Sequence, residues 1–241
     1  MFAIFKKEIR SFFTTPIGYL IIGLFLLLTG LFLWVFRGDF NVFDYGFADL
    51  SNFFLLAPWV FLFLIPAITM KSFSEEKKMG TLELLFIKPI SLWNIILGKF
   101  WAAMALCFLT LIPTLLYVFA INALGITKGN YDLGIIIGSY FGLFFLVAAY
   151  TAIGQFASSI SDNQIVAFIV AVVFCFILFQ GFEAVATLFS DATWIKKMGG
   201  KFHFENIAQG IINTRDIIYF ISIALFFLYL TFIRSKKIPA S

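Results

Sequence analysis

Six long stretches of the sequence contain no charged residue. They cover residues 11–36, 50–70, 100–127, 133–161, 163–182 and 217–233. An α-helix rises about 1.5 Å per residue, so about 20 residues cross a hydrocarbon core of about 30 Å. The stretches therefore predict six membrane-spanning helices, at residues 17–36, 53–70, 100–124, 133–159, 163–182 and 217–233. A membrane β-barrel would need alternating segments of about ten residues, whereas these runs are continuous.

The composition also points to lipid as the main solvent. Of the 241 residues, 62% are apolar and 12% are charged, against about 45–50% and about 25% in a soluble domain. We therefore expect one all-α polytopic membrane domain over residues 1–241. The 17 Lys and Arg residues are scattered between neutral runs, so a nucleic-acid partner is not expected, because such partners need a basic patch or stripe.

The N-terminal residues 1–15 have the pattern of an amphipathic helix lying in the membrane interface. Four apolar residues recur there at spacings of three or four, with charged residues between them: Phe2, Phe5, Ile9 and Phe12. Pro16 separates this helix from the first span.

Lys and Arg in the connections predict the orientation of the chain. Eleven of them lie on the side that holds both termini: Lys6, Lys7, Arg10, Lys71, Lys77, Lys78, Lys88, Lys99, Arg234, Lys236 and Lys237. Six lie on the other side: Arg37, Lys128, Lys196, Lys197, Lys201 and Arg215. We therefore expect both termini in the cytoplasm.

The cytoplasmic connection 71–99 is predicted to begin with a short helix. Ser72 followed by Glu75 fits a capping box, in which the two side chains satisfy the first backbone N–H groups. Pro89 forces a stop, and Ser91 is a good cap for the helix that re-enters the membrane.

The order of residues 75–91 carries the strongest functional signal. It reads Glu-Glu-Lys-Lys-Met-Gly-Thr-Leu-Glu-Leu-Leu-Phe-Ile-Lys-Pro-Ile-Ser. This order resembles a segment of type 2 ABC exporter permeases that reads acidic, basic, Gly-Thr-Leu-Glu, two apolar residues, and then Pro-Ile-Ser. In that family the segment follows the second of six membrane helices, as it does here, and the amphipathic N-terminal helix has a counterpart.

The resemblance implies a non-catalytic permease subunit of an ATP-driven exporter. In the family, this segment is a coupling helix that docks on a separate ATPase dimer, and that dimer binds ATP and Mg. The residues to which it assigns the coupling role are Glu75, Glu76, Lys77, Lys78, Gly80, Thr81, Glu83 and Pro89. No cofactor is expected in this chain, since neither Gly98-Lys99 nor Gly200-Lys201 has the spacing of a phosphate-binding loop.

A second permease subunit is also implied, because six helices form half of a translocation path in this family. Residues 1–13 and 202–216 are similar to the gliding-motility-associated permeases of Bacteroidota. That likeness favours a heteromeric partner with a periplasmic domain over a second copy of this chain. Two alternatives stay open: a mechanical coupler that drives a periplasmic partner without transport, and an ion-coupled secondary transporter.

The connection 183–216 contains the remaining candidates. The resemblance implies short extracytoplasmic helices here, ahead of the sixth span. Glu183 lies close to the end of the fifth span, where an ionisable group is either functional or paired with a loop cation such as Lys196 or Lys197. His203 has no Cys or His cluster beside it, so it is interpreted as an ordinary loop histidine rather than a metal ligand.

Small residues and a proline predict details of packing. Gly134, Gly138 and Gly142 fall four apart on one face of the fourth span, which lets another backbone approach closely, within this chain or at a subunit interface. Pro113 is expected to kink the third span.

Overall fold

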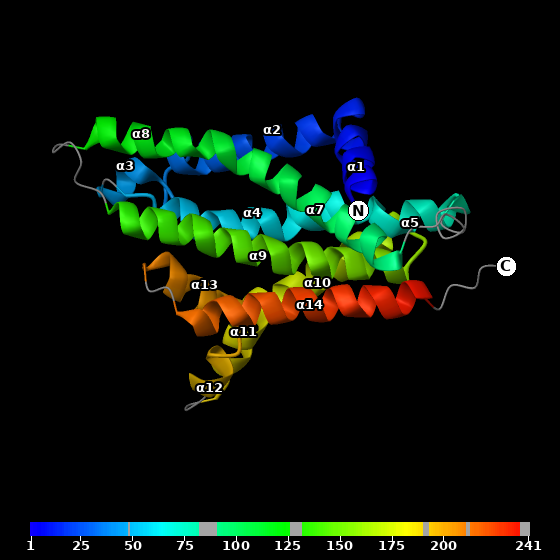
Figure 1. Cartoon of the computed structure of the whole chain (residues 1–241). Coiled ribbons are helices and arrows are strands. Elements are labelled where there is room, and N and C mark those ends of the chain that lie inside the picture. The colour runs from blue at the N-terminus through cyan, green and yellow to red at the C-terminus, as the bar shows by residue number, and fades with distance from the viewer. Residues whose placement is uncertain (48, 82–90, 126–131, 190–192, 211–212, 237–241) are drawn as a thin grey trace.

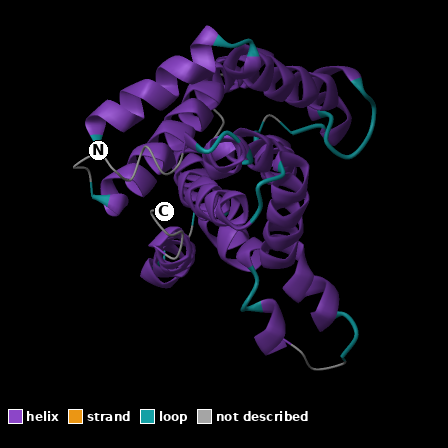
Figure 2. Cartoon of the chain, turned by 90° about the vertical axis from the view of Figure 1, so that its right-hand side faces the viewer, coloured by secondary structure: helices purple, strands orange, loops and turns teal. Residues whose placement is uncertain are grey.

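The computed structural model describes all residues except 48, 82–90, 126–131, 190–192, 211–212 and 237–241. Helices make up the secondary structure of this described part, with no strand in it (Figure 2). Six of its helical segments are long and apolar enough to cross a membrane, by length and composition. The prediction of an all-α polytopic membrane protein is therefore confirmed.

The chain follows the predicted order of spans. A short interface helix comes first, α1 (Phe2–Thr14), and the six spans follow: α2 (Ile17–Gly30) with η1 (Leu31–Val35); α4 (Ser51–Thr69) continuing into α5 (Lys71–Lys78); α7 (Leu92–Leu111), η2 (Ile112–Thr114) and α8 (Leu115–Leu124); α9 (Leu133–Ile160); α10 (Gln164–Phe176), η3 (Ile177–Gly181) and α11 (Phe182–Ala186); and α14 (Thr214–Lys236). Three further short helices lie in connections: α3 (Val42–Tyr45), α12 (Thr193–Lys196) and α13 (Gly200–Ala208).

The bundle is built around α9 and α4. Helix α9 runs along the molecule between α4 and α14 (Figure 1), and it packs against α14, α10, α4, α13 and α5. The most apolar stretch of α4 is 72% buried, against 22% for the span that begins at α10 and 28% for α14. The outer helices therefore leave broad apolar faces for lipid, while α4 is enclosed by protein.

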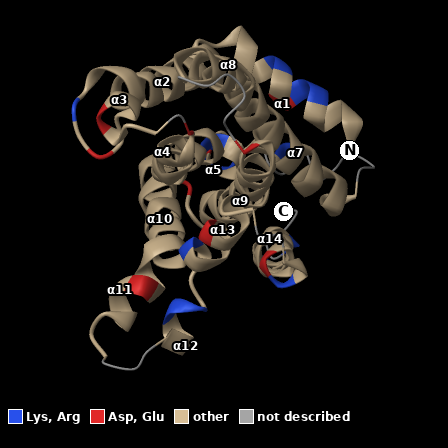
Figure 3. Cartoon of the chain, turned by 90° about the vertical axis from the view of Figure 1, so that its left-hand side faces the viewer, with Lys and Arg blue, Asp and Glu red and all other residues tan. Residues whose placement is uncertain are grey.

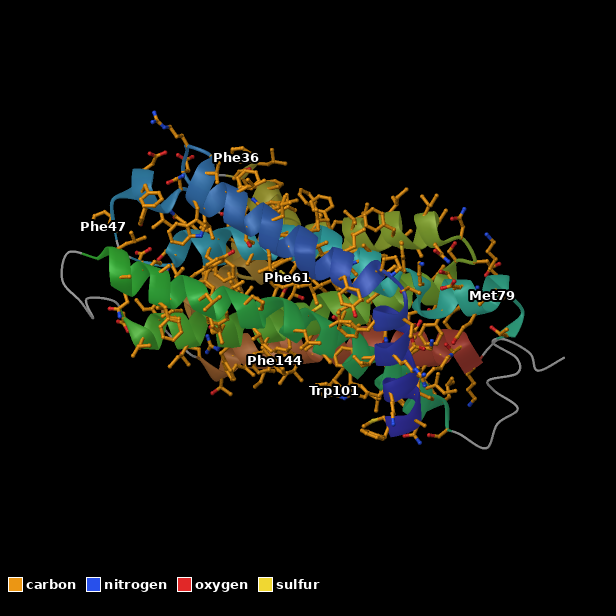
Figure 4. All side chains as sticks on the ribbon, turned by 90° about the horizontal axis from the view of Figure 1, so that it is seen from above. Phe36, Phe47, Phe61, Met79, Trp101 and Phe144 are labelled. Atoms are coloured by element: carbon orange, nitrogen blue, oxygen red, sulfur yellow. The ribbon has the colours of Figure 1, made fainter. Side chains whose placement is uncertain are left out.

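Aromatic rings fill much of the space between α2 and α4. Phe25 stacks on Phe61 with ring centroids 4.6 Å apart and meets the edge of Phe53 at 6.5 Å. All three side chains are buried, and Figure 4 labels Phe61 near the middle of the bundle. Such pairs contribute about 0.5–1.5 kcal/mol each beyond the burial of their area, so they help to fix α2 against α4.

The bundle has two ends, which we call the α5 end and the α3 end. The α5 end holds α1, α5, the last turns of α9 and α14, and the N-terminus, and Met79 is labelled there in Figure 4. The α3 end holds α3, α8, α13 and the start of α9, and Phe47 marks it in the same view. The segment α11–α12 projects sideways from the bundle (Figure 1).

Local signals in the sequence set several helix boundaries. The Ser91 Oγ accepts a hydrogen bond from the Asn94 N–H at 3.3 Å and caps α7, as predicted. Pro113 lies in the 3₁₀ segment between α7 and α8, so the predicted break in the third span is confirmed. Helix α1 ends just before Pro16, which separates it from α2.

The predicted capping box at Ser72 and Glu75 is wrong, although the helix it was meant to start is present. Helix α5 begins at Lys71, so Ser72 lies inside it, and no side chain of its own caps it. The reason is tertiary: α4 runs almost directly into α5, and the first free N–H groups of α5 find their acceptor on α9, as described below.

Candidate coupling site

The first turn of α5 is held by a serine near the end of α9. The Ser158 Oγ accepts hydrogen bonds from the backbone N–H groups of Phe73 at 2.9 Å and Ser74 at 3.1 Å, and it donates to the Met70 carbonyl at 2.8 Å. The hydroxyl therefore supplies the cap that α5 lacks in its own sequence, because free N–H groups at a helix start need an acceptor.

A second contact holds the far end of α5 to α9. The Lys77 ammonium donates to the Ser159 carbonyl at 2.6 Å and lies 3.7 Å from an Asp162 carboxylate oxygen. Its side chain is only 12% exposed. Lys77, one of the residues assigned a coupling role, thus faces the bundle and fastens α5 to the end of α9.

Helices α4 and α9 cross closely just before α5 begins. A Cβ placed on Gly154 would lie 2.0 Å from the Thr69 Oγ1, a distance that real atoms do not occupy. The Thr69 hydroxyl itself is occupied, since it donates to the Ile65 carbonyl at 2.8 Å. Gly154 is therefore required for the approach of the two helices that position α5.

A buried lysine joins α5 to two other helices. The Lys99 ammonium, on α7, lies 3.0 Å from a carboxylate oxygen of Glu8 on α1 and 3.0 Å from one of Glu76 on α5, and it donates to the Ser72 carbonyl at 2.7 Å. The Lys7 ammonium reaches the same oxygen of Glu76 at 3.1 Å. We call Lys7, Glu8, Glu76 and Lys99 the Lys99 cluster.

Three of the four side chains of the Lys99 cluster are largely shielded from solvent, whereas that of Lys7 is 58% exposed. The side chain of Lys99 is 3% exposed and that of Glu76 is 10% exposed, and the ammonium of Lys99 also lies 5.3 Å from the centre of the Phe73 ring. An isolated charge at such a place is very costly, so the pairing with two carboxylates is what allows Lys99 to be there. The cluster therefore makes α1, α5 and α7 depend on one another.

Close packing reinforces the link between α1 and α7. A Cβ on Gly98 would lie 3.0 Å from the Ile4 side chain and 3.1 Å from the Met1 carbonyl oxygen. Ile4 is also the buried residue of α1. Helix α1 is therefore seated on α7 by its apolar face and by its charges together.

The opposite face of α5 is open. Lys78, Met79 and Gly80 are exposed, and Glu75 is half-buried. Gly80 has φ +67°, a left-handed conformation that favours glycine, and its N–H donates to the Lys77 carbonyl at 3.0 Å, which ends α5. Thr81 donates its hydroxyl to the Glu76 carbonyl at 3.3 Å. Glu83 and Pro89 lie outside the described residues.

The site thus contains residues that the pattern of residues 75–91 did not reveal. Glu8, Lys99 and Ser158 come from three different helices and lie outside that pattern in sequence. One signal for Lys99 is present in the sequence, because it is the only charged residue in the otherwise apolar run 92–127. A charge in such a place needs a partner, although the sequence does not say which.

Glu183 lies in a second, more exposed ion-pair group, near the α3 end. One carboxylate oxygen lies 3.2 Å from the Lys196 ammonium, and the other lies 2.6 Å from that of Lys201. Lys201 also lies 3.8 Å from Glu205. Figure 3 shows the acidic residue of α11 facing the region of α12 and α13 that carries these lysines. The expected pairing with Lys196 is present, and Lys201 rather than Lys197 is the second partner.

The prediction that His203 is an ordinary loop residue is wrong. It lies in a helix and takes part in a structural contact. It lies in α13, its Nδ1 is 2.5 Å from an Asp216 carboxylate oxygen, and its ring stacks on Tyr219 with centroids 4.1 Å apart. The Tyr219 hydroxyl donates to the Met198 carbonyl at 2.7 Å. These contacts hold α13 against the start of α14. The order of residues in the sequence does not show which side chain His203 meets.

The small-residue face of α9 receives α13 of the same chain. A Cβ on Gly138 would lie 3.1 Å from the Ile207 carbonyl oxygen, and one on Gly142 would lie 3.1 Å from the Ile207 side chain. Gly134 is next to Asp132, the cap of α9. The close approach at Gly138 and Gly142 is therefore made within one chain, whereas no second helix approaches Gly134 in the described part of the structure.

The fold and this site define a class: a polytopic α-helical membrane protein in which an N-terminal helix and the extension of the second span are joined at one end of the bundle. The chain belongs to the ABC-2 family of transporter proteins, whose family model matches residues 2–235. It is thus a membrane permease subunit of an ABC transporter. No curated protein matches the chain by sequence.

Proposed function

We propose that this chain couples ATP hydrolysis on a separate ATPase to export, with α5 as the element that receives the motion. The Lys99 cluster is the observation that carries this proposal. One face of α5 is tied to α1, α7 and α9, whereas the other face is open, so a partner that moves α5 would also move the helices attached to it.

The coupling residues fall into two groups under this proposal. Glu75 and Lys78 are placed to meet a partner, because they are not fully buried and make no ion pair in the part of the chain that the structure describes. Glu76 and Lys77 act as positioning residues, because their charged groups contact α7, α1 and α9. ATP and Mg would be held by the partner ATPase dimer.

The orientation follows from the same assignment. With the α5 end in the cytoplasm, the larger share of Lys and Arg residues lies on the cytoplasmic side, as the positive-inside rule requires. Both termini would then be cytoplasmic and the chain would lie in the bacterial inner membrane. The segment α11–α12 and helix α13 would face the other side.

A second permease subunit completes the proposed transporter. The similarity of residues 1–13 and 202–216 to the GldF-type gliding-motility permeases supports a heteromeric partner with a periplasmic domain. Residues 202–216 include His203 and Asp216, whose contact fixes α13 against α14. Export, or work on motility, would then be done by the pair of permeases with their ATPase.

A double charge reversal tests the docking role of α5. The variant Glu75→Lys with Lys78→Glu leaves the Lys99 cluster intact, so the attachment of α5 to α1 and α7 is unchanged while the charges on its open face are reversed. We expect the tagged permease, purified from native membranes, to lose most of the ATPase that co-purifies with it, as judged by mass spectrometry and ATP hydrolysis.

The matched control is Arg37→Glu, an exposed charge at the α3 end. It should insert and retain the ATPase like the unchanged chain. Retention of the ATPase at full strength by the double variant would overturn the assignment of α5.

A further inference from the structure

A cavity lies beside the Lys99 cluster, at the α5 end of the bundle. Its volume is about 280 Å³, and residues of α1, α2, α4, α5 and α7 line it. A water molecule takes about 30 Å³ of liquid volume, so the space exceeds that of a few bound waters. It is large enough for the polar part of a small amphiphilic molecule.

The walls of the cavity change character along its length. Phe12, Ile17 and Ile68 line the part next to the spans, whereas Lys71, Glu75 and Glu76 line the part beyond the end of α4. Helix α1 forms the side, and its amphipathic pattern suits the plane of the membrane interface. A ligand that fits must therefore have an apolar part on the membrane side and charged groups on the other.

Two charged groups of the wall have no partner in the described part of the chain. Lys71 and Glu75, one helical turn apart on α5, make no ion pair or hydrogen bond through their side chains there. Both residues are half-buried. Glu76 beside them binds Lys7 and Lys99 through its Oε1, and its Oε2 is buried out of reach of a ligand.

These groups specify complementary charges in the ligand. The free ammonium of Lys71 calls for an anion, and a phosphate offers several acceptor oxygens. The Glu75 carboxylate favours a cation that still carries N–H bonds. One molecule with a phosphate, a primary ammonium group and apolar chains satisfies both residues and matches the change along the walls.

We infer that this cavity binds a phospholipid with a primary amine headgroup. The phosphate lies on Lys71, the ammonium group lies on Glu75, and the acyl chains leave past Phe12, Ile17 and Ile68. The bound lipid would fill the space between α1 and α5. This inference does not depend on the ATPase partner, because it requires only that the chain spans a membrane.

Lipid exchange on the unchanged full chain tests the headgroup. The purified protein is delipidated in detergent and offered phosphatidylethanolamine, phosphatidylcholine or phosphatidylglycerol of identical acyl chains, and bound lipid is counted by native mass spectrometry. We expect phosphatidylethanolamine to be retained about fivefold to tenfold better, since choline has no N–H donor and the glycerol headgroup has no cation.

Two variants test the position of the lipid. Lys71→Gln and Glu75→Gln remove no contact within the described chain, and each should lower retention of phosphatidylethanolamine about fivefold. The matched control is Lys78→Gln, on the same helix but outside the cavity, which should bind lipid like the unchanged chain.

Three results would overturn the inference. Equal retention of the three lipids would show that the amine is not recognised. Full retention of phosphatidylethanolamine by both variants would show that the lipid does not bind at Lys71 and Glu75. Competition by soluble glycerophosphoethanolamine as effective as that of the lipid would show that the cavity takes a soluble zwitterion instead.

Discussion

Two of the charged groups in the described part of the molecule, the Lys99 cluster and the group around Glu183, differ in what they connect. Lys99, Glu8 and Glu76 are largely buried, and the cluster joins residues up to 91 positions apart, on α1, α5 and α7. The group around Glu183 is more open, with the Lys196 side chain 46% exposed, and it joins three consecutive short helices. The first therefore fixes the arrangement of separate helices, whereas the second shapes one local segment.

Breaking the Lys99 cluster should cost more stability than breaking the ion pairs of Glu183. Removing one partner from a buried pair leaves an uncompensated charge and costs about 3–5 kcal/mol. An exposed pair contributes about 0.2–1 kcal/mol. Four substitutions test this comparison, from the largest expected effect to the smallest.

Lys99→Met should destabilise the protein most. It removes the buried cation between the carboxylates of Glu8 and Glu76 and leaves near them only Lys7, whose side chain is 58% exposed, so we expect a loss of about 3–5 kcal/mol in the free energy of unfolding. Denaturation in detergent, followed by circular dichroism, measures this loss. The control is Lys78→Met, which changes an exposed lysine of α5. An equal loss of stability in both variants would show that the Lys99 cluster contributes no more than a surface charge.

Gly154→Ala should disturb the crossing of α4 and α9 that positions α5. Its Cβ would collide with the Thr69 Oγ1, and overpacking of this kind costs about 1–3 kcal/mol. Gly23→Ala in α2 is the matched control, because nothing lies within 4 Å of its Cβ position. Thermal unfolding in detergent distinguishes them; unchanged stability of the Gly154 variant would mean that the helices separate without cost.

Ser158→Ala should loosen α5 with a smaller effect on overall stability. It leaves the N–H groups of Phe73 and Ser74 without their acceptor, at a cost of about 1–3 kcal/mol. Hydrogen exchange at these two amides should become faster. Ser159→Ala is the neighbouring control, since the Ser159 hydroxyl bonds only locally to the Phe156 carbonyl, and equal exchange in both variants would contradict the capping role.

Glu183→Gln should have the smallest effect. Its pairs with Lys196 and Lys201 are partly solvated, so we expect a loss of about 0.2–1 kcal/mol and normal transport or gliding. Lys197→Gln, a neighbouring lysine, is the control. Loss of transport with normal folding would give Glu183 the functional role that its position near a span allows.

The cavity adjoins only one of the two charged groups. The Lys99 cluster forms part of the wall of the cavity for which we propose a lipid, so lipid binding and the linkage of α1 to α5 are expected to depend on one another. In the group around Glu183, Lys201 pairs with both Glu183 and Glu205.

The sequence by itself determined the features that depend on neighbouring residues. Charge-free runs marked the six spans, because a charge on the lipid face is unfavourable. Spacing predicted the amphipathic α1, Ser91 marked the start of α7, and Pro113 marked the break before α8. The family pattern in residues 75–91 identified a segment that begins in the last turn of α5.

Only the tertiary structure decided how the helices are rotated and which groups they bring together. Ser158 replaced the cap expected from Ser72, His203 met Asp216, and Gly138 received α13. Lys99 is the clearest case: the sequence marked it as the end of a connection, yet it lies inside α7. A buried charge is tolerated wherever packing delivers partners, and packing joins residues that no local pattern relates.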